Sequence, residues 1–240
     1  MRNIIYLIII ASCFLLGASV AAQALNLSAA EQHQYLKTTG SKQLYFNWQL
    51  IPGDDLRLVT LLGDEEDTTR MNPDLATYSW SVDDPVAGTA LKVVRDNNQL
   101  VIDGTFKGRK VERRVSIDSA PWYQALSLSL RQFTDRSKQH LEFWTIRPDT
   151  LDLHRMQVTR TADEVLKREG HENKTIKLKI QLTGLKAAFW SCYYWLRESD
   201  GLFVRYEGPS GPPGWPLTTV ELINPPNQVS VDHDPSRLTQ

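Results

Sequence analysis

The sequence lacks the short motifs that mark most enzyme families. It has no Gly-x-Ser-x-Gly nucleophile elbow, no His-Glu-x-x-His or Cys-x-x-Cys metal spacing, and no glycine-rich loop that opens a helix. Nucleophilic catalysis needs a nucleophile held by a base, and phosphate binding needs backbone donors at the start of a helix. The five histidines are also scattered along the chain. The residues therefore favour a non-enzymatic protein that holds neither a metal ion nor another cofactor.

Cysteine is scarce. Cys13 and Cys192 are the two cysteines, and Cys13 lies within an apolar run at the N-terminus. If that run is removed, Cys192 stays alone and no intramolecular disulfide can form. Unpaired cysteine is among the most buried residue types, so we expect Cys192 to be a buried and unreactive core residue.

No charge of one sign dominates the chain. It has 27 lysines and arginines against 28 aspartates and glutamates, for a formal net charge of −1. Its basic clusters are pairs rather than long runs. The sequence therefore gives no sign of a nucleic-acid partner or of electrostatic attraction to a membrane.

An apolar run without charge opens the chain. Residues 4–22 are almost wholly apolar, with Arg2 ahead of them and Ala22-Gln23-Ala24 behind them. This order predicts a signal peptide over residues 1–24, cleaved before Leu25, and hence a periplasmic or secreted protein without a stable membrane span. Two alternatives stay open. A lipobox could end at Cys13, or the run could be kept as an anchor, since it approaches the ~20 apolar residues that span a bilayer.

Short segments of alternating hydropathy follow the leader. Turn residues such as glycine, proline, asparagine and aspartate separate them, which is typical of antiparallel strands joined by hairpins. The clearest segments are Lys42–Leu50, Leu56–Leu62, Leu75–Val82, Val111–Ile117 and Thr175–Leu182. We expect one β-rich domain over residues 25–223 and a polar C-terminal tail over residues 224–240.

Three segments are expected to depart from this strand pattern. Ser28 and Glu31 match a capping box, which predicts a partly helical start over residues 25–40. The acidic residues 64–67 are expected to form a solvated hairpin loop. Residues 208–216 are rich in proline and glycine, and proline removes donors from a ladder, so this segment is predicted to be a loop.

Residues 120–133 are predicted to form the one internal helix. Ser119 is a suitable N-cap, and Pro121 falls in the first turn, where proline is tolerated. An apolar stripe of Trp122, Leu126, Leu130 and Phe133 recurs at helical spacing. We expect this stripe to pack on the sheet.

The aromatic strand over residues 189–196 is the most distinctive segment. Successive side chains of a strand point to opposite faces, and here both faces are aromatic. The strand is therefore either packed on both sides or lines an apolar pocket, in which ring hydroxyls would meet the polar end of a ligand. The candidate pocket residues of the helix and this strand are Trp122, Leu126, Leu130, Trp190, Tyr193, Tyr194 and Trp195.

The layout of residues 42–223 resembles that of bacterial exported proteins similar to the lipoprotein-carrier superfamily. The likeness is carried by Ile102–Asp118, Pro121–Phe133, and Phe189–Trp195 with Gly201–Gly214. It implies a mainly β fold, in which a strongly curved antiparallel sheet forms a half-barrel with a single core helix on its concave face.

The resemblance also implies a function. Such carriers hold acyl chains in the half-barrel, so a lipid or a lipoprotein would be the partner, and the candidate pocket residues would line the cavity. The alternative is a structural or interaction protein of the envelope whose own side chains fill the core. The sequence does not define the oligomeric state.

Overall fold

The computed structural model of the chain describes residues 27–168, 171–188, 190–209 and 215–223. The predicted signal peptide with its cleavage site, the alternative lipobox at Cys13, and the predicted polar tail lie outside these residues. No helix in the described ranges is long and apolar enough to cross a membrane.

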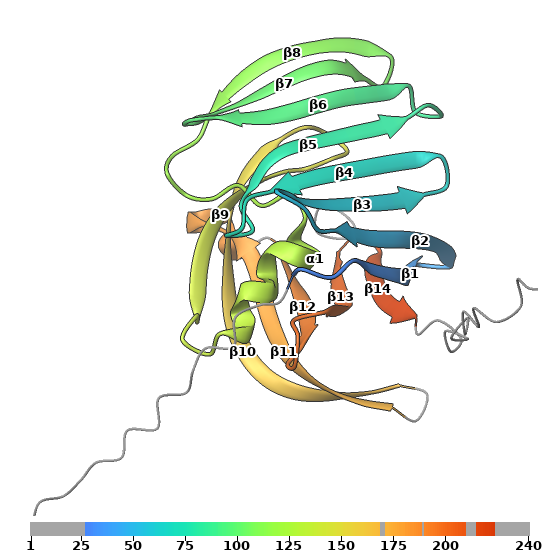
Figure 1. The fold of residues 1–240 in the computed structure, drawn as a ribbon, viewed down its shortest axis with the longest axis vertical. Helices are drawn as coiled ribbons and strands as arrows, with labels where there is room; N and C mark the ends of the chain where they lie inside the picture. Colours follow the sequence, from blue (N-terminus) through green and yellow to red (C-terminus); the bar gives the residue numbers. More distant parts are fainter. Residues whose placement is uncertain (1–26, 169–170, 189, 210–214, 224–240) are drawn as a thin grey trace, which may run out of the picture.

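Within the described residues, fourteen strands form one antiparallel sheet (Figure 1). The strands are β1 (Glu31–Thr39), β2 (Lys42–Ile51), β3 (Leu56–Leu62), β4 (Glu65–Met71), β5 (Thr77–Asp84), β6 (Thr89–Asp96), β7 (Gln99–Phe106), β8 (Arg109–Ser116), β9 (His140–Ile146), β10 (Leu153–Arg168), β11 (His171–Leu182), β12 (Ser191–Arg197), β13 (Phe203–Pro209) and β14 (Leu217–Ile223). Sequence neighbours pair within β1–β8 and within β9–β14, and the two runs meet where β1 pairs with β14. The sheet is open, and β8 and β9 are its edges.

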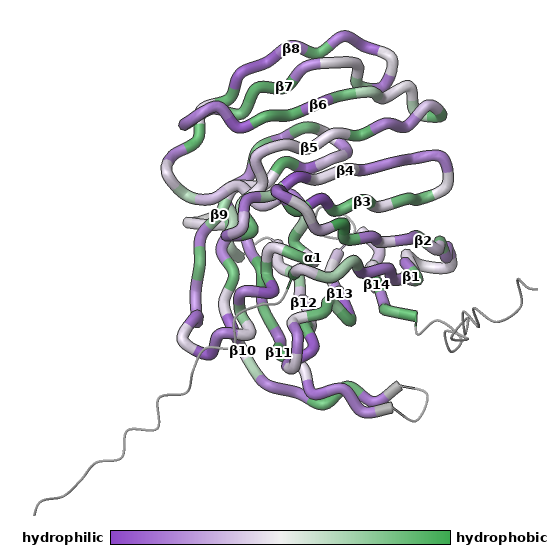
Figure 2. Tube along the Cα trace, in the orientation of Figure 1, coloured by the Kyte–Doolittle hydropathy of each residue, from purple (hydrophilic) through white to green (hydrophobic). Residues whose placement is uncertain are grey.

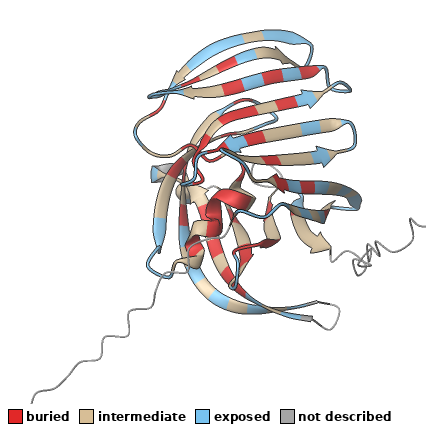
Figure 3. Cartoon of the chain, viewed as in Figure 1, coloured by how far each residue is buried: buried red, intermediate tan, exposed pale blue. Residues whose placement is uncertain are grey.

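The sheet bends around a short helical segment between β8 and β9 (Figure 1). This segment consists of α1 (Leu126–Ser129) and the 3₁₀ turn η1 (Leu130–Thr134). Leu128, Leu130 and Phe133 are fully buried, and buried positions gather on the segment and the strands behind it (Figure 3). The predicted curved half-barrel with one helix on its concave face is therefore confirmed.

Alternating hydropathy explains why these residues form strands. Along β6, Leu91 and Val93 are buried and Lys92 between them is exposed. Figure 2 shows that hydrophobic and hydrophilic residues also interchange along other strands. The β7–β8 turn is Lys107-Gly108, and both residues have positive φ, as a two-residue turn between strands of right-handed twist requires. The alternation of side chains and the residues of the turns together explain why consecutive segments form antiparallel strands.

The predicted helix over residues 120–133 is wrong in its first half. Trp122 is extended and pairs in parallel with Trp144 of β9. The Trp144 N–H donates to the Pro121 carbonyl and the Tyr123 N–H donates to the Trp144 carbonyl, both at 2.8 Å. Because these backbone groups bond to the edge of the sheet, helix begins only at Leu126. The stripe expected from Trp122 to Phe133 therefore does not lie along one helix.

Three other sequence predictions fail, one of them in part. Gly208 and Pro209, expected in a loop, end β13 and pair with Thr218 and Leu217 of β14. The expected helical start contains β1, which pairs along its whole length with β2 and also with β14, and this tertiary pairing overrides the local capping signal. The acidic residues expected in a loop enter β4, where Asp67 accepts a hydrogen bond from the indole of buried Trp80 at 2.8 Å. Burial raises the pKa of Asp67 to about 7.

The buried apolar residues form two clusters. The larger fills the hollow around α1 and η1, with Leu50, Leu128 and Phe143 among its members. The smaller is held by β5–β8 together with Trp122 and Ile146. Predicted site residues that belong to different clusters cannot line the same ligand site.

Candidate functional site

A row of five aromatic side chains crosses the larger cluster, and we call it the aromatic row. In spatial order its members are Phe46, Tyr35, Phe203, Tyr194 and Tyr206. The first three gaps between ring centroids are 5.3 Å each, and the fourth is 5.2 Å. These spacings are within the range in which aromatic pairs attract each other. The five rings thus form one continuous series of contacts through the cluster.

Strand register brings the rings together. Phe46 lies opposite Tyr35 in the β1–β2 pair, and Tyr194 lies opposite Tyr206 in the β12–β13 pair. The β12–β13 register shifts at Trp195/Leu196, so that Leu196 faces Phe203. A bulge of this kind changes the direction of a side chain, and here it accounts for Phe203 joining the row.

The middle of the row is packed and its two ends are open. Tyr35 is fully buried and Phe203 is 5% exposed, and the Tyr35 hydroxyl donates to the Phe203 carbonyl at 2.8 Å. Phe46, Tyr194 and Tyr206 are only partly buried. Burial nevertheless raises the pKa of Tyr194 and that of Tyr206. Neither hydroxyl bonds to another described residue.

Four of the predicted site residues lie in the same cluster as the row. Leu130 is fully buried there, while Leu126, Trp190 and Tyr194 are partly buried against it. Trp122 instead belongs to the smaller cluster, and its indole donates to Gln124 at 3.1 Å. The structure therefore separates Trp122 from the two leucines with which the sequence grouped it.

Tyr193 and Trp195 lie on the other face of β12. Their rings are 6.0 Å apart, and the Lys177 ammonium lies 5.0 Å from each ring. The Trp195 indole donates to Glu164 at 2.9 Å. These contacts place both side chains among charged groups on the convex face rather than in the concave core, as strand alternation requires, and these groups bury Trp195.

Sequence reasoning missed four residues of the row: Tyr35, Phe46, Phe203 and Tyr206. A signal was present for Phe46, Phe203 and Tyr206, which are aromatic residues in short strand-like segments, whereas Tyr35 lies in the segment that was expected to be helical. The missing information was the pairing of β1 with β14, which brings the two ends of the chain together.

Neither of two clefts on the described surface is lined by a residue of the aromatic row. The larger, of about 440 Å³, has polar groups such as Asp74, Arg95, Gln132 and Lys138 in its wall. The smaller, of about 150 Å³, lies beside Arg205. No three His, Cys, Asp or Glu side chains of the described residues gather as metal ligands.

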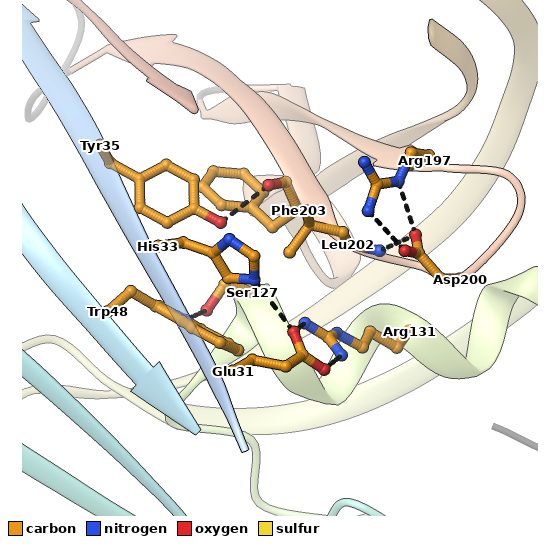
Figure 4. A network of polar contacts seen from close by, with 10 residues as sticks. All are labelled: Glu31, His33, Tyr35, Trp48, Ser127, Arg131, Arg197, Asp200, Leu202 and Phe203. Atoms are coloured by element: carbon orange, nitrogen blue, oxygen red, sulfur yellow. Dashed lines mark hydrogen bonds and ion pairs between the residues drawn. The ribbon is translucent and has the colours of Figure 1, made fainter. Parts of the chain in front are cut away.

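A polar network fastens the helical segment beside the row (Figure 4). Arg131 is 2% exposed and donates to both carboxylate oxygens of Glu31, at 2.6 and 2.7 Å. Its guanidinium also lies 5.3 Å from the Trp48 ring, whose indole donates to Ser127 at 3.0 Å. Burial raises the pKa of Glu31, but hydrogen bonds from Arg131 and His33 outweigh this effect and lower the pKa to about 2.

We expect the native protein to resist thiol reagents. Cys192 is 1% exposed, and burial raises the pKa of its thiol. A Cβ atom added at Gly208 would lie 2.4 Å from the Cys192 Cβ, so the two strands leave no room for a reagent. Labelling followed by mass spectrometry should show modification only in denaturant. Rapid labelling of the folded protein would show that this part of the core opens.

No family model matches the sequence, and no curated protein matches it. The structure is similar to that of a β-barrel-like protein of the domain of unknown function DUF1849 from Brucella abortus. The TM-score is 0.56 at 9% identity, over 82% of this chain and 97% of the other. The chain shares the fold of the Brucella protein. The half-barrel implied by the sequence resemblance is thus found in a solved structure, and at this identity the likeness concerns the fold alone.

Two weaker likenesses carry no argument about this chain. The hypothetical lipoprotein YmcC from Escherichia coli has a TM-score of 0.35 at 10% identity, over 85% of this chain and 90% of the other. A LolA superfamily protein from Nitrosomonas europaea has a TM-score of 0.28 at 9% identity, over 82% of this chain and 85% of the other.

Proposed function

We propose that this chain is an exported, non-enzymatic envelope protein that binds a lipid or another apolar ligand against the aromatic row. The observation that carries the proposal is that three linked rings of the row, Phe46, Tyr194 and Tyr206, are only partly buried at the margin of the larger cluster. Export rests on the apolar leader of the sequence. The proposal needs no catalytic group, metal ion or cofactor.

The row suits a ligand with an apolar body and a polar end. Flat rings offer contact area at little cost in conformational entropy, and the Tyr194 and Tyr206 hydroxyls offer hydrogen bonds to a headgroup. Covering about 300 Å² of apolar surface contributes about 7 kcal/mol before the costs of association. We therefore expect a dissociation constant no lower than micromolar.

A second candidate is a structural or interaction protein of the envelope that takes up no ligand. It is favoured by the packing of the hollow, where Tyr35, Leu128, Leu130 and Phe133 are fully buried. On this alternative, the open ends of the row would be ordinary partly exposed core residues.

A fluorescent fatty-acid probe separates the two candidates. The described part of the chain places Trp48 and Trp190 in or against the larger cluster, so a probe bound at the row should accept energy from tryptophan. Ligand binding predicts saturable transfer with one site per chain, reversed by unlabelled fatty acid. A signal that rises without saturation, or none up to the solubility limit of the probe, would favour the self-filled core.

A further inference from the structure

The two edges of the open sheet differ in whether another segment hydrogen-bonds to their backbone groups. Along β9, the segment around Trp122 covers part of the edge with backbone hydrogen bonds, described above. Along β8, no described residue hydrogen-bonds to the outward backbone groups. Figure 1 shows β8 as the outermost strand of its run. The outward backbone groups of β8 are thus unpaired within the described residues.

The geometry of β8 suits the addition of a strand. The residues flanking a two-residue turn exchange both backbone hydrogen bonds, and every second residue along the pair does the same. The turn is Lys107-Gly108, so the backbone groups of Lys110, Glu112 and Arg114 point away from β7. The β7–β8 register runs unbroken from Phe106↔Arg109 to Gln99↔Ser116, and the strand contains no proline. Of the common protections of edges, β8 carries charged side chains but has neither a bulge nor a proline.

The charge of the β8 side chains indicates which kind of segment could bind at this edge. β8 carries four basic side chains and one acidic one in eight residues, and it is largely exposed (Figure 3). The side chains of Lys110, Glu112 and Arg114 are 80%, 75% and 63% exposed. Lys110 pairs with Glu112 at 3.5 Å and Arg114 with Asp96 at 3.6 Å, and ion pairs so exposed contribute little. A second β8 would bring the same excess of positive charge to the pair, and like charges opposite one another are unfavourable in a sheet.

We propose that β8 is a docking edge for an extended acidic segment of a partner protein, which joins the sheet as a further strand. Hydrogen bonds to the outward groups of Lys110, Glu112 and Arg114 supply affinity, and the basic side chains select acidic partners. The edge is separate from the aromatic row, so this docking does not depend on ligand binding in the concave face.

The test uses a labelled peptide of about nine residues in which threonine and glutamate alternate. Its control is the same peptide with every backbone amide N-methylated, which keeps the charge and removes the donors. In the protein, Glu112→Pro removes an outward N–H without breaking a bond to β7, and Glu112→Thr is the matched control. Circular dichroism and melting temperature verify that each variant folds.

Fluorescence anisotropy should show that the plain peptide binds and the N-methylated peptide does not. Glu112→Pro should bind the plain peptide about tenfold more weakly than Glu112→Thr, as for one lost hydrogen bond. The double variant Lys110→Glu/Arg114→Glu should also weaken binding about tenfold at low salt, and by less at high salt.

Four outcomes would overturn the proposal. Equal binding of both peptides would indicate charge attraction without strand pairing. Equal affinities of Glu112→Pro and Glu112→Thr for the plain peptide would show that the outward N–H of residue 112 donates no hydrogen bond to it. If the plain peptide does not bind, β8 is not a docking edge for acidic segments. A dimer that sedimentation detects in the parent protein and that Glu112→Pro abolishes would make a second copy the occupant.

Discussion

Glu31→Ala should lower the free energy of unfolding by about 3–5 kcal/mol at pH 7, because it leaves the buried guanidinium of Arg131 without its partner. Arg131 is 2% exposed, and its Nε already lacks a hydrogen-bond partner among the described residues. Chemical denaturation with matched slopes for the two proteins would measure the loss. A loss below about 1 kcal/mol, typical of an exposed ion pair, would show that water reaches this site.

A double variant separates the lost pair from lost packing. Glu31→Ala with Arg131→Met removes both charges, and replacing a buried pair by apolar groups is often close to neutral. We therefore expect the double variant to recover most of the loss.

The same pair should make stability depend on acid. The pKa of Glu31 is about 2 in the folded state, against 4.5 for the ordinary side chain. A carboxyl group with a lowered folded pKa stabilises above its unfolded pKa, and the contribution is lost as pH falls toward the folded value. Stability should thus decline between pH 4.5 and about 2, and this decline should be shallower in Glu31→Ala.

Trp122→Ala should cost about 3–5 kcal/mol of stability, as for other large-to-small changes at fully buried positions. Trp122 is fully buried in the smaller cluster, whereas Trp215 is 56% exposed. Trp215→Ala is the matched control and should change stability by no more than about 0.5 kcal/mol. Thermal or chemical unfolding of the two variants makes the comparison.

The Trp122 variant also tests where a ligand could sit. Because Trp122 lies in the smaller cluster, affinity for a fatty-acid probe should be unchanged in those molecules that stay folded. If the variant is fully folded and binds the probe more weakly, Trp122 would belong to the ligand site, as the apolar stripe in the sequence predicted.

Local patterns predicted much of the sheet. The pattern of residues 42–50 and 56–62 predicts β2 and β3 with nearly the observed bounds, and the inward positions Trp48, Leu50 and Leu58 are buried. The pattern failed where distant pairing decides the structure. β1 carries a capping box, yet its pairing with β14 joins segments over 170 residues apart, such as Gln34 with Ile223. No local signal reports such a contact.

The candidate site shows the same division. Alternation along residues 189–196 correctly put Tyr194 and Trp195 on opposite faces of a strand. It could not tell which face is concave, since that depends on the curvature of the whole sheet. Phe203 joins the row across a register shift, which sequence periodicity does not reveal.

Neighbouring tyrosines on β12 test the ligand site most directly. Tyr194 belongs to the aromatic row, and Tyr193 points to the opposite face, where it lies beside Lys177. Affinity for the fluorescent fatty acid should be measured in Tyr194→Ser and Tyr193→Ser at a temperature where both are folded. We expect Tyr194→Ser to bind about tenfold more weakly, as for the loss of one aromatic contact, and Tyr193→Ser to bind like the parent. Equal affinities in the two variants, or a loss confined to Tyr193→Ser, would contradict a ligand site on the concave face.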